Sequence, residues 1–240
     1  MNHPLLKFLF HRLGLEITHN RNQRISLYQA INHLRNLGYL PSVIVDAGVA
    51  SGTPALYTNY PQTKTILIEP LDEYNNVINE ILKRYPDFHY VKRALSDKDG
   101  LISFYSKEYK SGSSEYLADD ESTAENIRVE SITLEQIIEE YNISSPALLK
   151  LDIEGSEKKV LLSSTDAVKQ FNVIICEVTF IPRLNEAPAF AEIQTIMTGI
   201  GYCVFDIVDI RYEKNKHNLF QADIVYIKKD SPFRQQKNIH

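Results

Sequence analysis

The sequence has few cysteines, no excess of positive charge and no long apolar run, and each absence narrows what the protein can be. Only two cysteines occur in 240 residues, and both Cys176 and Cys203 lie in apolar, strand-like runs. We therefore expect buried free thiols in a reducing compartment, and we find no metal or redox spacing. Lys and Arg number 26 against 31 Asp and Glu, a net charge of -5. This balance argues against nucleic acid as a partner, because binding a phosphate backbone needs clustered positive charge.

The N-terminal segment 4–15 mixes bulky apolar residues with cations, and it is too short to span a bilayer. No small-residue cleavage site follows it, so a cytoplasmic location is the default expectation. We interpret the segment as a helix that packs on the domain or on a second subunit, which allows a homo-oligomer through N-terminal helices. Peripheral contact with a membrane surface through the same residues is the alternative.

What the sequence does have is enough length and apolar content, 43% of 240 residues, to bury a core. We expect an N-terminal helical extension over 1–40, one domain over 41–229 and a disordered tail over 230–240. Strand-like and helix-like segments alternate through the domain, which predicts an α/β fold with a mostly parallel sheet and helices on both faces. Strands are predicted at 43–46, 64–69, 88–95, 147–152 and 172–178, with a closing antiparallel pair at 201–208 and 221–228. Between residues 97 and 130 the sequence has two short β-like pieces with a polar stretch between them. A polar loop of that length is typical of a functional or mobile segment.

The first predicted strand leads into a glycine turn. A β-branched run ends at Asp46, Gly48 and Gly52 follow, and Thr53-Pro54 begins a new segment. Thr53 is placed to cap a helix whose first position is Pro54. In an open α/β sheet such a turn lies at the carboxyl end of a strand, where ligands bind and where glycines let the backbone approach them.

Acids follow four of the predicted strands: Asp46, Glu69, Asp152 with Glu154, and Glu177. Because the carboxyl ends of parallel strands lie along one edge of the sheet, we expect these five side chains to converge on a ligand site.

Glu69 lies 17 residues after Gly52 at the end of the neighbouring strand, where such folds place an acid that binds the ribose hydroxyls of an adenosine. Asp46 stands in place of the first glycine of a dinucleotide fingerprint. A carboxylate is unfavourable beside a pyrophosphate but favourable beside the sulfonium and ammonium groups of S-adenosylmethionine. A dinucleotide-dependent oxidoreductase is thus the disfavoured alternative.

Several stretches between about Leu37 and Glu177 resemble the FkbM family of S-adenosylmethionine-dependent methyltransferases. They are the segment 37–48, Ile68-Glu69-Pro70, Ala94-Leu95-Ser96-Asp97 with Gly100, Ser113-Ser114, residues 129–134, and the Lys-x-Asp-x-Glu-Gly-x-Glu block that starts at Lys150. The resemblance implies a class I, Rossmann-like methyltransferase with a seven-stranded sheet. The cofactor-binding residues that it implies are Asp46, Gly48 and Gly52 on the methionine side, Glu69 at the ribose, and Leu95 and Ser96 near the adenine.

The resemblance also implies that Asp152 and Glu154 follow the fourth strand beside the methyl group. Methyl transfer needs alignment and a base for the acceptor proton, and we expect Asp152 first and Glu154 second in that role. The alternative is structural, with Glu154 and Glu157 in the first turn of the next helix, where negative charge is favoured. A divalent cation held by Asp152, Glu154 and Glu177 is a further option, without ligand spacing to support it.

The predicted reaction is methyl transfer to a hydroxyl of a sugar, a glycan precursor or a secondary metabolite, because no Asn/Asp-Pro-Pro-Tyr type motif for nucleobase amines follows the fourth strand. Ala50 stands where the family usually has Asn, and Pro54 follows in a loop that usually lacks proline. Ala50 removes a side-chain amide that could position the loop, so a cofactor-binding module without turnover is the alternative from another class.

Overall fold

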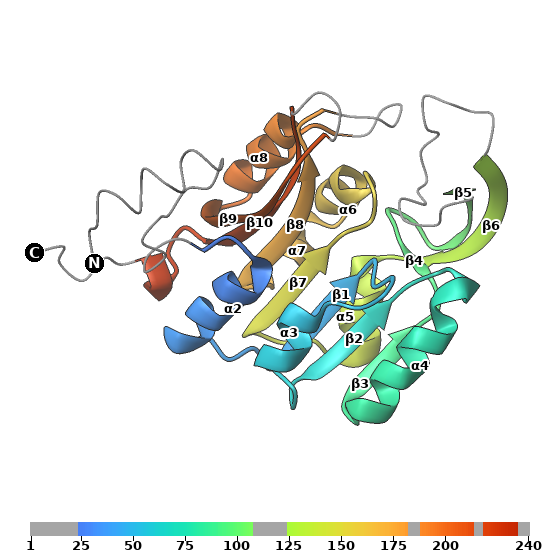
Figure 1. Ribbon diagram of the computed structural model, residues 1–240, viewed down its shortest axis with the longest axis horizontal. Helices are drawn as coiled ribbons and strands as arrows, with labels where there is room; N and C mark the ends of the chain where they lie inside the picture. Colours follow the sequence, from blue (N-terminus) through green and yellow to red (C-terminus); the bar gives the residue numbers. More distant parts are fainter. Residues whose placement is uncertain (1–23, 108–123, 182–187, 214–217, 235–240) are drawn as a thin grey trace, which may run out of the picture.

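The computed structural model describes residues 24–107, 124–181, 188–213 and 218–234, and its centre is a seven-stranded sheet in the order β3-β2-β1-β7-β8-β10-β9 (Figure 1). Neighbouring strands from β3 to β8 run parallel, whereas β10 pairs antiparallel with both β8 and β9. The strand order reverses between β1 and β7, which is where this architecture binds ligands. The strands are β1(Val43–Ala47), β2(Lys64–Ile68), β3(Phe88–Val91), β7(Ala147–Leu151), β8(Val173–Thr179), β9(Tyr202–Tyr212) and β10(Leu219–Lys228).

Helices cover both faces of this sheet, as the alternation of the sequence predicts. Because successive side chains of a strand point to opposite faces, β1 sends Val43, Val45 and Ala47 into one apolar cluster and Ile44 into another. The cluster around Ile44 is covered by α2(Leu27–Asn36), α3(Pro54–Asn59) and α4(Asn75–Arg84). The other cluster is covered by α5(Leu134–Tyr141), α6(Glu157–Ser163), α7(Thr165–Val168) and α8(Phe190–Gly199).

Helix ends follow local sequence signals at α2 and α5. The Ser26 side chain accepts a hydrogen bond from the Gln29 amide at the start of α2, and Gly38 just beyond its end has φ +94°. Thr133 and Gln136 form a reciprocal capping box at α5. The short η1(Asp72–Tyr74) precedes α4.

The start of α3 differs from the prediction. Pro54 occupies the first turn as expected, but Thr53 makes no side-chain cap. Its hydroxyl instead donates inward to Asp46 at 3.2 Å. Leaving a buried carboxylate without donors costs more free energy than leaving a helix end without a side-chain cap, because solvent can reach the helix end.

The predicted third strand, 88–95, is wrong as a single strand. The main sheet loses it after Val91, and β4(Ala94–Leu95) joins β5(Gly100–Lys107) and β6(Ala124–Ile132) in a separate sheet of order β4-β6-β5, at the right of Figure 1. The two intervening cations turn outward, where Lys92 pairs with Asp72 and Arg93 pairs with Glu130. The expected polar loop therefore has a β-hairpin at its base, and residues 108–123 lie outside the described residues.

The chain ends are described only in part. Residues 1–23, including the segment 4–15, lie outside the described residues, so the N-terminal helix, its membrane alternative, the oligomer and the domain limits stay predictions. At the other end, Phe233 in the short η3(Pro232–Arg234) packs edge-on against Tyr39, residues 235–240 lie outside the described residues, and the disordered tail stays a prediction. Within the described part of the chain, no helix has the length and apolarity that crossing a membrane requires.

Candidate functional site

The glycine turn after β1 is held against the ends of two other strands. Gly48 has φ +79°, and its amide donates to the carbonyl of Ile68 at 3.0 Å. A Cβ atom on Gly48 would lie 1.7 Å from the backbone oxygen of Asp152. Glycine is therefore required here because the end of β7 presses directly on the turn. The sequence predicted this glycine for ligand approach, and the structure adds this backbone contact.

Ala50 lies at the crest of the turn with φ +43°, a left-handed conformation that asparagine tolerates better than alanine. Its amide donates to Glu69 Oε2 at 2.9 Å. On the side of the turn this contact uses only the backbone amide of residue 50. Alanine in place of the asparagine usual in FkbM-like sequences therefore keeps the hydrogen bond between the turn and Glu69.

Glu69 is almost fully buried, with 4% of its surface exposed. Its Oε2 accepts from Ala50, and its Oε1 accepts from the Leu71 amide at 3.0 Å. Burial raises the pKa of Glu69, and these two amides oppose the shift. Each carboxylate oxygen can accept a second hydrogen bond, so the arrangement can also take a pair of hydroxyl groups.

Asp46 faces protein groups rather than an open cavity. It has no exposed surface, and its carboxylate accepts hydrogen bonds from the hydroxyls of Tyr57 at 2.6 Å and Thr53 at 3.2 Å. The ammonium of Lys150 lies 3.9 Å from Asp46 Oδ1. Burial raises the pKa of Asp46, and Lys150 and the two hydroxyls oppose the shift.

Lys150 is a site residue that the sequence analysis did not single out. It lies opposite Asp46 in the β1–β7 register, it is 5% exposed, and its Nζ donates to Asp152 Oδ2 at 2.8 Å. Burial by itself lowers the pKa of Lys150, but the carboxylates of Asp152 and Asp46 outweigh it and raise that pKa above its ordinary value. A lysine between Leu149 and Leu151 in a buried strand was the available signal.

Three of the five acids predicted at strand ends gather where β7 has ended and β8 nears its carboxyl end. Asp152, Glu154 and Glu177 each offer a carboxylate oxygen, and these atoms lie within 4.8 Å of one another. Glu154 has φ +52°, a backbone conformation that is strained for glutamate and that occurs preferentially at functional sites. Asp46 is connected to Asp152 by Lys150, which lies near both carboxylates. Glu69 is connected by the glycine turn, because Ala50 donates to Glu69 and Gly48 lies against the backbone of Asp152.

Glu177 already has partners for both oxygens: Arg211 donates to Oε1 at 2.6 Å and Gln221 donates to Oε2 at 3.0 Å. Burial, followed by the charges of Asp152 and Glu154, raises the pKa of Glu177 to about 9. The guanidinium of Arg211 already places a positive charge 2.6 Å from Glu177 Oε1, which disfavours a divalent cation beside the same carboxylate, so we do not propose a metal site. Arg211 and Gln221 escaped sequence reasoning because only the antiparallel pairing of β9 and β10 brings them here.

Leu95 and Ser96 belong to the interior in this structure. Leu95 is 2% exposed and lies in an apolar cluster, and Ser96 has no exposed surface. The Ser96 amide donates to the carbonyl of Ile132 at 3.0 Å, and its hydroxyl donates to Asp97 at 3.1 Å. Their predicted position near an adenine therefore stays a prediction.

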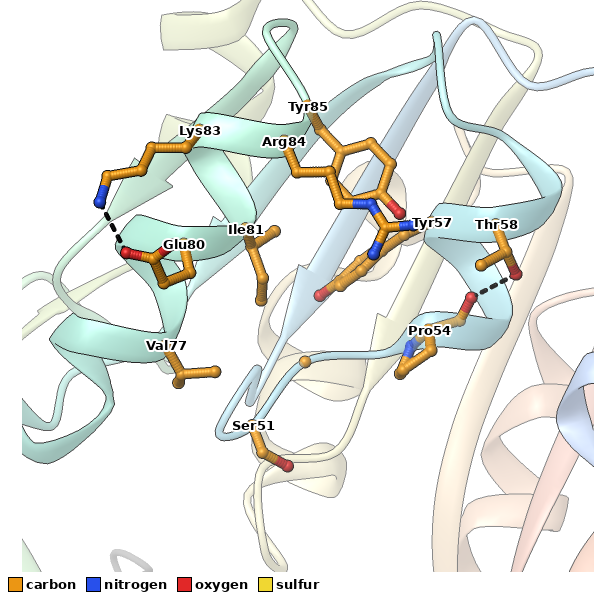
Figure 2. Close-up of a pocket in the computed structure, with 11 residues that line it drawn as sticks. Ser51, Pro54, Tyr57, Thr58, Val77, Glu80, Ile81, Lys83, Arg84 and Tyr85 are labelled. Atoms are coloured by element: carbon orange, nitrogen blue, oxygen red, sulfur yellow. Dashed lines mark hydrogen bonds and ion pairs between the residues drawn. The ribbon is translucent and has the colours of Figure 1, made fainter.

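A groove of about 520 Å³ lies between α3 and α4 (Figure 2). Ser51 and Gly52 of the glycine turn line it together with Tyr57 of α3, so the groove borders the candidate site. Gly52 is in close contact with this wall, since a Cβ atom there would lie 2.9 Å from Ile81 Cδ1 and 3.2 Å from Tyr57 Cε2.

The sheet order, the reversal between β1 and β7 and the acid-rich rim define a class I methyltransferase fold. A sequence model described as the methyltransferase FkbM domain matches residues 46–204, roughly two thirds of the chain. The chain belongs to the FkbM methyltransferase family. This assignment confirms the resemblance seen in the motifs and sets aside the dinucleotide-dependent oxidoreductase.

Comparison with solved structures gives only loose similarities. Magnesium protoporphyrin IX methyltransferase from Synechocystis PCC 6803, with bound SAM, is 10% identical with a TM-score of 0.47, over 95% of this chain and 85% of that chain. The N1-methyltransferase of 1,6-didemethyltoxoflavin from Burkholderia thailandensis is 11% identical with a TM-score of 0.45, over 85% and 79% of the two chains. No curated protein sequence matches the chain. These similarities are too low to support an argument, so the identification rests on the family match and the sheet topology.

Proposed function

We propose that the protein transfers a methyl group from S-adenosylmethionine to a hydroxyl of a sugar, a glycan precursor or a secondary metabolite. The observation that carries the proposal is the joint arrangement of the glycine turn, buried Glu69 and the carboxylates beyond β7 at the point where the strand order reverses. Membership of a methyltransferase family supports it.

The residues present fit the cofactor. Among the described residues each oxygen of Glu69 accepts one hydrogen bond, and a second accepting position on each oxygen suits the two ribose hydroxyls. In our proposal Gly48 and Gly52 give the turn its shape on the methionine side, Asp46 supports that turn from beneath, and Leu95 and Ser96 form the wall near the adenine. Bound S-adenosylmethionine supplies an electrophilic methyl group on a sulfonium.

The chain's own contribution to the reaction is alignment and removal of the acceptor proton. Lys150 occupies Asp152 Oδ2, so we assign the proton-accepting role to Asp152 Oδ1. Glu154 is the second candidate because it lies in the same group of carboxylates. A hydroxyl acceptor is preferred because no Asn/Asp-Pro-Pro-Tyr type motif for nucleobase amines follows β7, and a carboxylate can take the proton of a hydroxyl group.

Calorimetric titration with S-adenosylhomocysteine tests the cofactor assignment. We expect wild-type protein to bind it, and Glu69→Ala to weaken binding by tenfold or more, because hydrogen bonds to a charged group contribute about 1.5–3 kcal/mol. Glu130→Ala serves as the control, since Glu130 is an exposed carboxylate on β6 of the second sheet and is paired with Arg93. No binding at millimolar ligand would refute the proposal.

A second assay separates an enzyme from a binding module. Conversion of S-adenosylmethionine to S-adenosylhomocysteine is measured with a panel of neutral sugars, glycan precursors and hydroxylated metabolites. We expect turnover with at least one acceptor, lost in Asp152→Asn with cofactor binding retained. Tight cofactor binding with no transfer across the panel would instead favour the module without turnover, the alternative that Ala50 suggests.

A further inference from the structure

Tyr57 lies in a fixed position beside the glycine turn. It belongs to α3, the helix that begins where the turn ends, and 3% of its surface is exposed. Its ring centroid lies 5.2 Å from that of Phe88 and 5.9 Å from that of Tyr85. Figure 2 shows the ring directed inward between α3 and α4. These aromatic neighbours leave the side chain little freedom to point elsewhere.

This one side chain contacts both ends of the turn. The Tyr57 hydroxyl donates to Asp46 Oδ2 at 2.6 Å, before the turn. Its ring edge lies against Gly52 at the end of the turn, where a Cβ atom would be 3.2 Å from Tyr57 Cε2. The short distance to Asp46 is that of a strong hydrogen bond to a charged acceptor.

The two oxygens of Asp46 are not equivalent in their partners. Thr53 and Lys150 both approach Oδ1, whereas Tyr57 is the partner of Oδ2 within the described part of the chain. Removing the Tyr57 hydroxyl would leave one oxygen of a fully buried carboxylate without a donor. Such an oxygen is costly, and the carboxylate and the attached turn would rearrange to satisfy it.

We propose that Tyr57 is a positioning residue for the cofactor turn. Through Asp46 and Gly52 it holds residues 48–52 in the conformation in which the Ala50 amide meets Glu69, and it thereby sets the affinity for the cofactor. The identity of the ligand rests on the proposed function, whereas the effect on the turn does not. Tyr57 lies on the groove side of the turn and touches no reacting atom, so its role is distinct from that of Asp152.

The test compares Tyr57→Phe with Tyr60→Phe. Tyr60 is a matched control because it is buried at the end of the same helix, and its hydroxyl donates to the carbonyl of Tyr39 at 3.1 Å, away from the turn. Affinity for S-adenosylhomocysteine is measured by calorimetry at a temperature where circular dichroism shows all proteins folded. We expect Tyr57→Phe to weaken binding by about tenfold and Tyr60→Phe to change it less than twofold. Equal affinities for wild type and Tyr57→Phe would overturn the proposal, as would equal weakening by both variants.

Hydrogen exchange of the free proteins gives a readout that needs no ligand. We expect the amides of Ala50 and Gly52 to exchange about tenfold faster in Tyr57→Phe than in wild type, and unchanged in Tyr60→Phe. Unchanged exchange at the turn in Tyr57→Phe would overturn the positioning role. If wild type binds no S-adenosylhomocysteine, the proposed function fails, and faster exchange at the turn in Tyr57→Phe would still support the role of Tyr57.

Discussion

Replacing Gly48 with alanine tests whether the glycine turn and the end of β7 are in direct backbone contact. The added Cβ atom would lie 1.7 Å from the carbonyl oxygen of Asp152, so the two backbones must separate by about 1.3 Å to reach the closest distance that real Cβ atoms show, 3.0 Å. Overpacking of this kind costs about 1–3 kcal/mol. The left-handed conformation, with φ +79°, costs a further 1–2 kcal/mol approximately for a residue with a Cβ atom. The two penalties together are about 2–5 kcal/mol, compared with a free energy of unfolding of about 5–15 kcal/mol for an ordinary domain.

Gly201→Ala is the matched control for this substitution. Gly201 has a similar φ of +98°, but a Cβ atom there would have no heavy atom within 4 Å. Both variants lose the freedom of glycine in the unfolded chain equally, so the difference between them isolates the contact with Asp152. Urea denaturation followed by circular dichroism should show Gly48→Ala to be less stable than Gly201→Ala by about 1–3 kcal/mol. Equal free energies of unfolding would refute the argument.

Two further predictions concern buried charges. Lys150→Met leaves two carboxylates without their shared cation and should lower the free energy of unfolding by about 3–5 kcal/mol. The control is Lys158→Met at an exposed lysine paired with Glu192, which should lower the free energy of unfolding by less than about 1 kcal/mol. Similar losses for the two variants in urea denaturation would contradict the role of Lys150. Burial raises the pKa of Glu157 to about 8. Between the ordinary glutamate pKa and pH 8, Glu157 therefore keeps its proton in the folded state and has lost it in the unfolded state. The free energy of unfolding falls as the pH rises through this window. Glu157→Gln should flatten that fall by up to about 1.4 kcal/mol per pH unit, and a slope unchanged from wild type would show that Glu157 does not titrate there.

The local parts of the fold were predictable because their signals are local. The capping residues of α2 and α5 and the order of strands and helices follow from the spacing of apolar residues and turn formers. The glycine turn was found in the same way, because a β-branched run followed by glycines predicts a strand and a tight turn. The third strand was predicted too long, because the residue types at 88–95 are compatible with one continuous strand. Only the pairing of Ala94 and Leu95 with β6 places β4 in the second sheet.

The site was predictable as a set of acids at strand ends, but their partners were not. Lys150 reaches Asp46 because β1 and β7 are neighbours, although about a hundred residues separate the two strands in the sequence. Tyr57 carries no recognisable signal in a short helix, and only the packing of α3 against β1 brings it to Asp46.

Residue type and short-range spacing were therefore enough to identify the family, the strand-and-turn unit around Asp46 and Gly48, and the acids that follow the strands. The packing of strands and helices was needed to show that Gly48 is required by the backbone of Asp152, that Asp46 is held by Tyr57 and Lys150, and that Glu177 is bound by Arg211. Most of those contacts join residues far apart in the chain, and the contact between Asp46 and Tyr57, 11 residues apart, depends on how α3 packs against β1. Their distances and burial are consequences of how strands and helices pack, which no local pattern encodes.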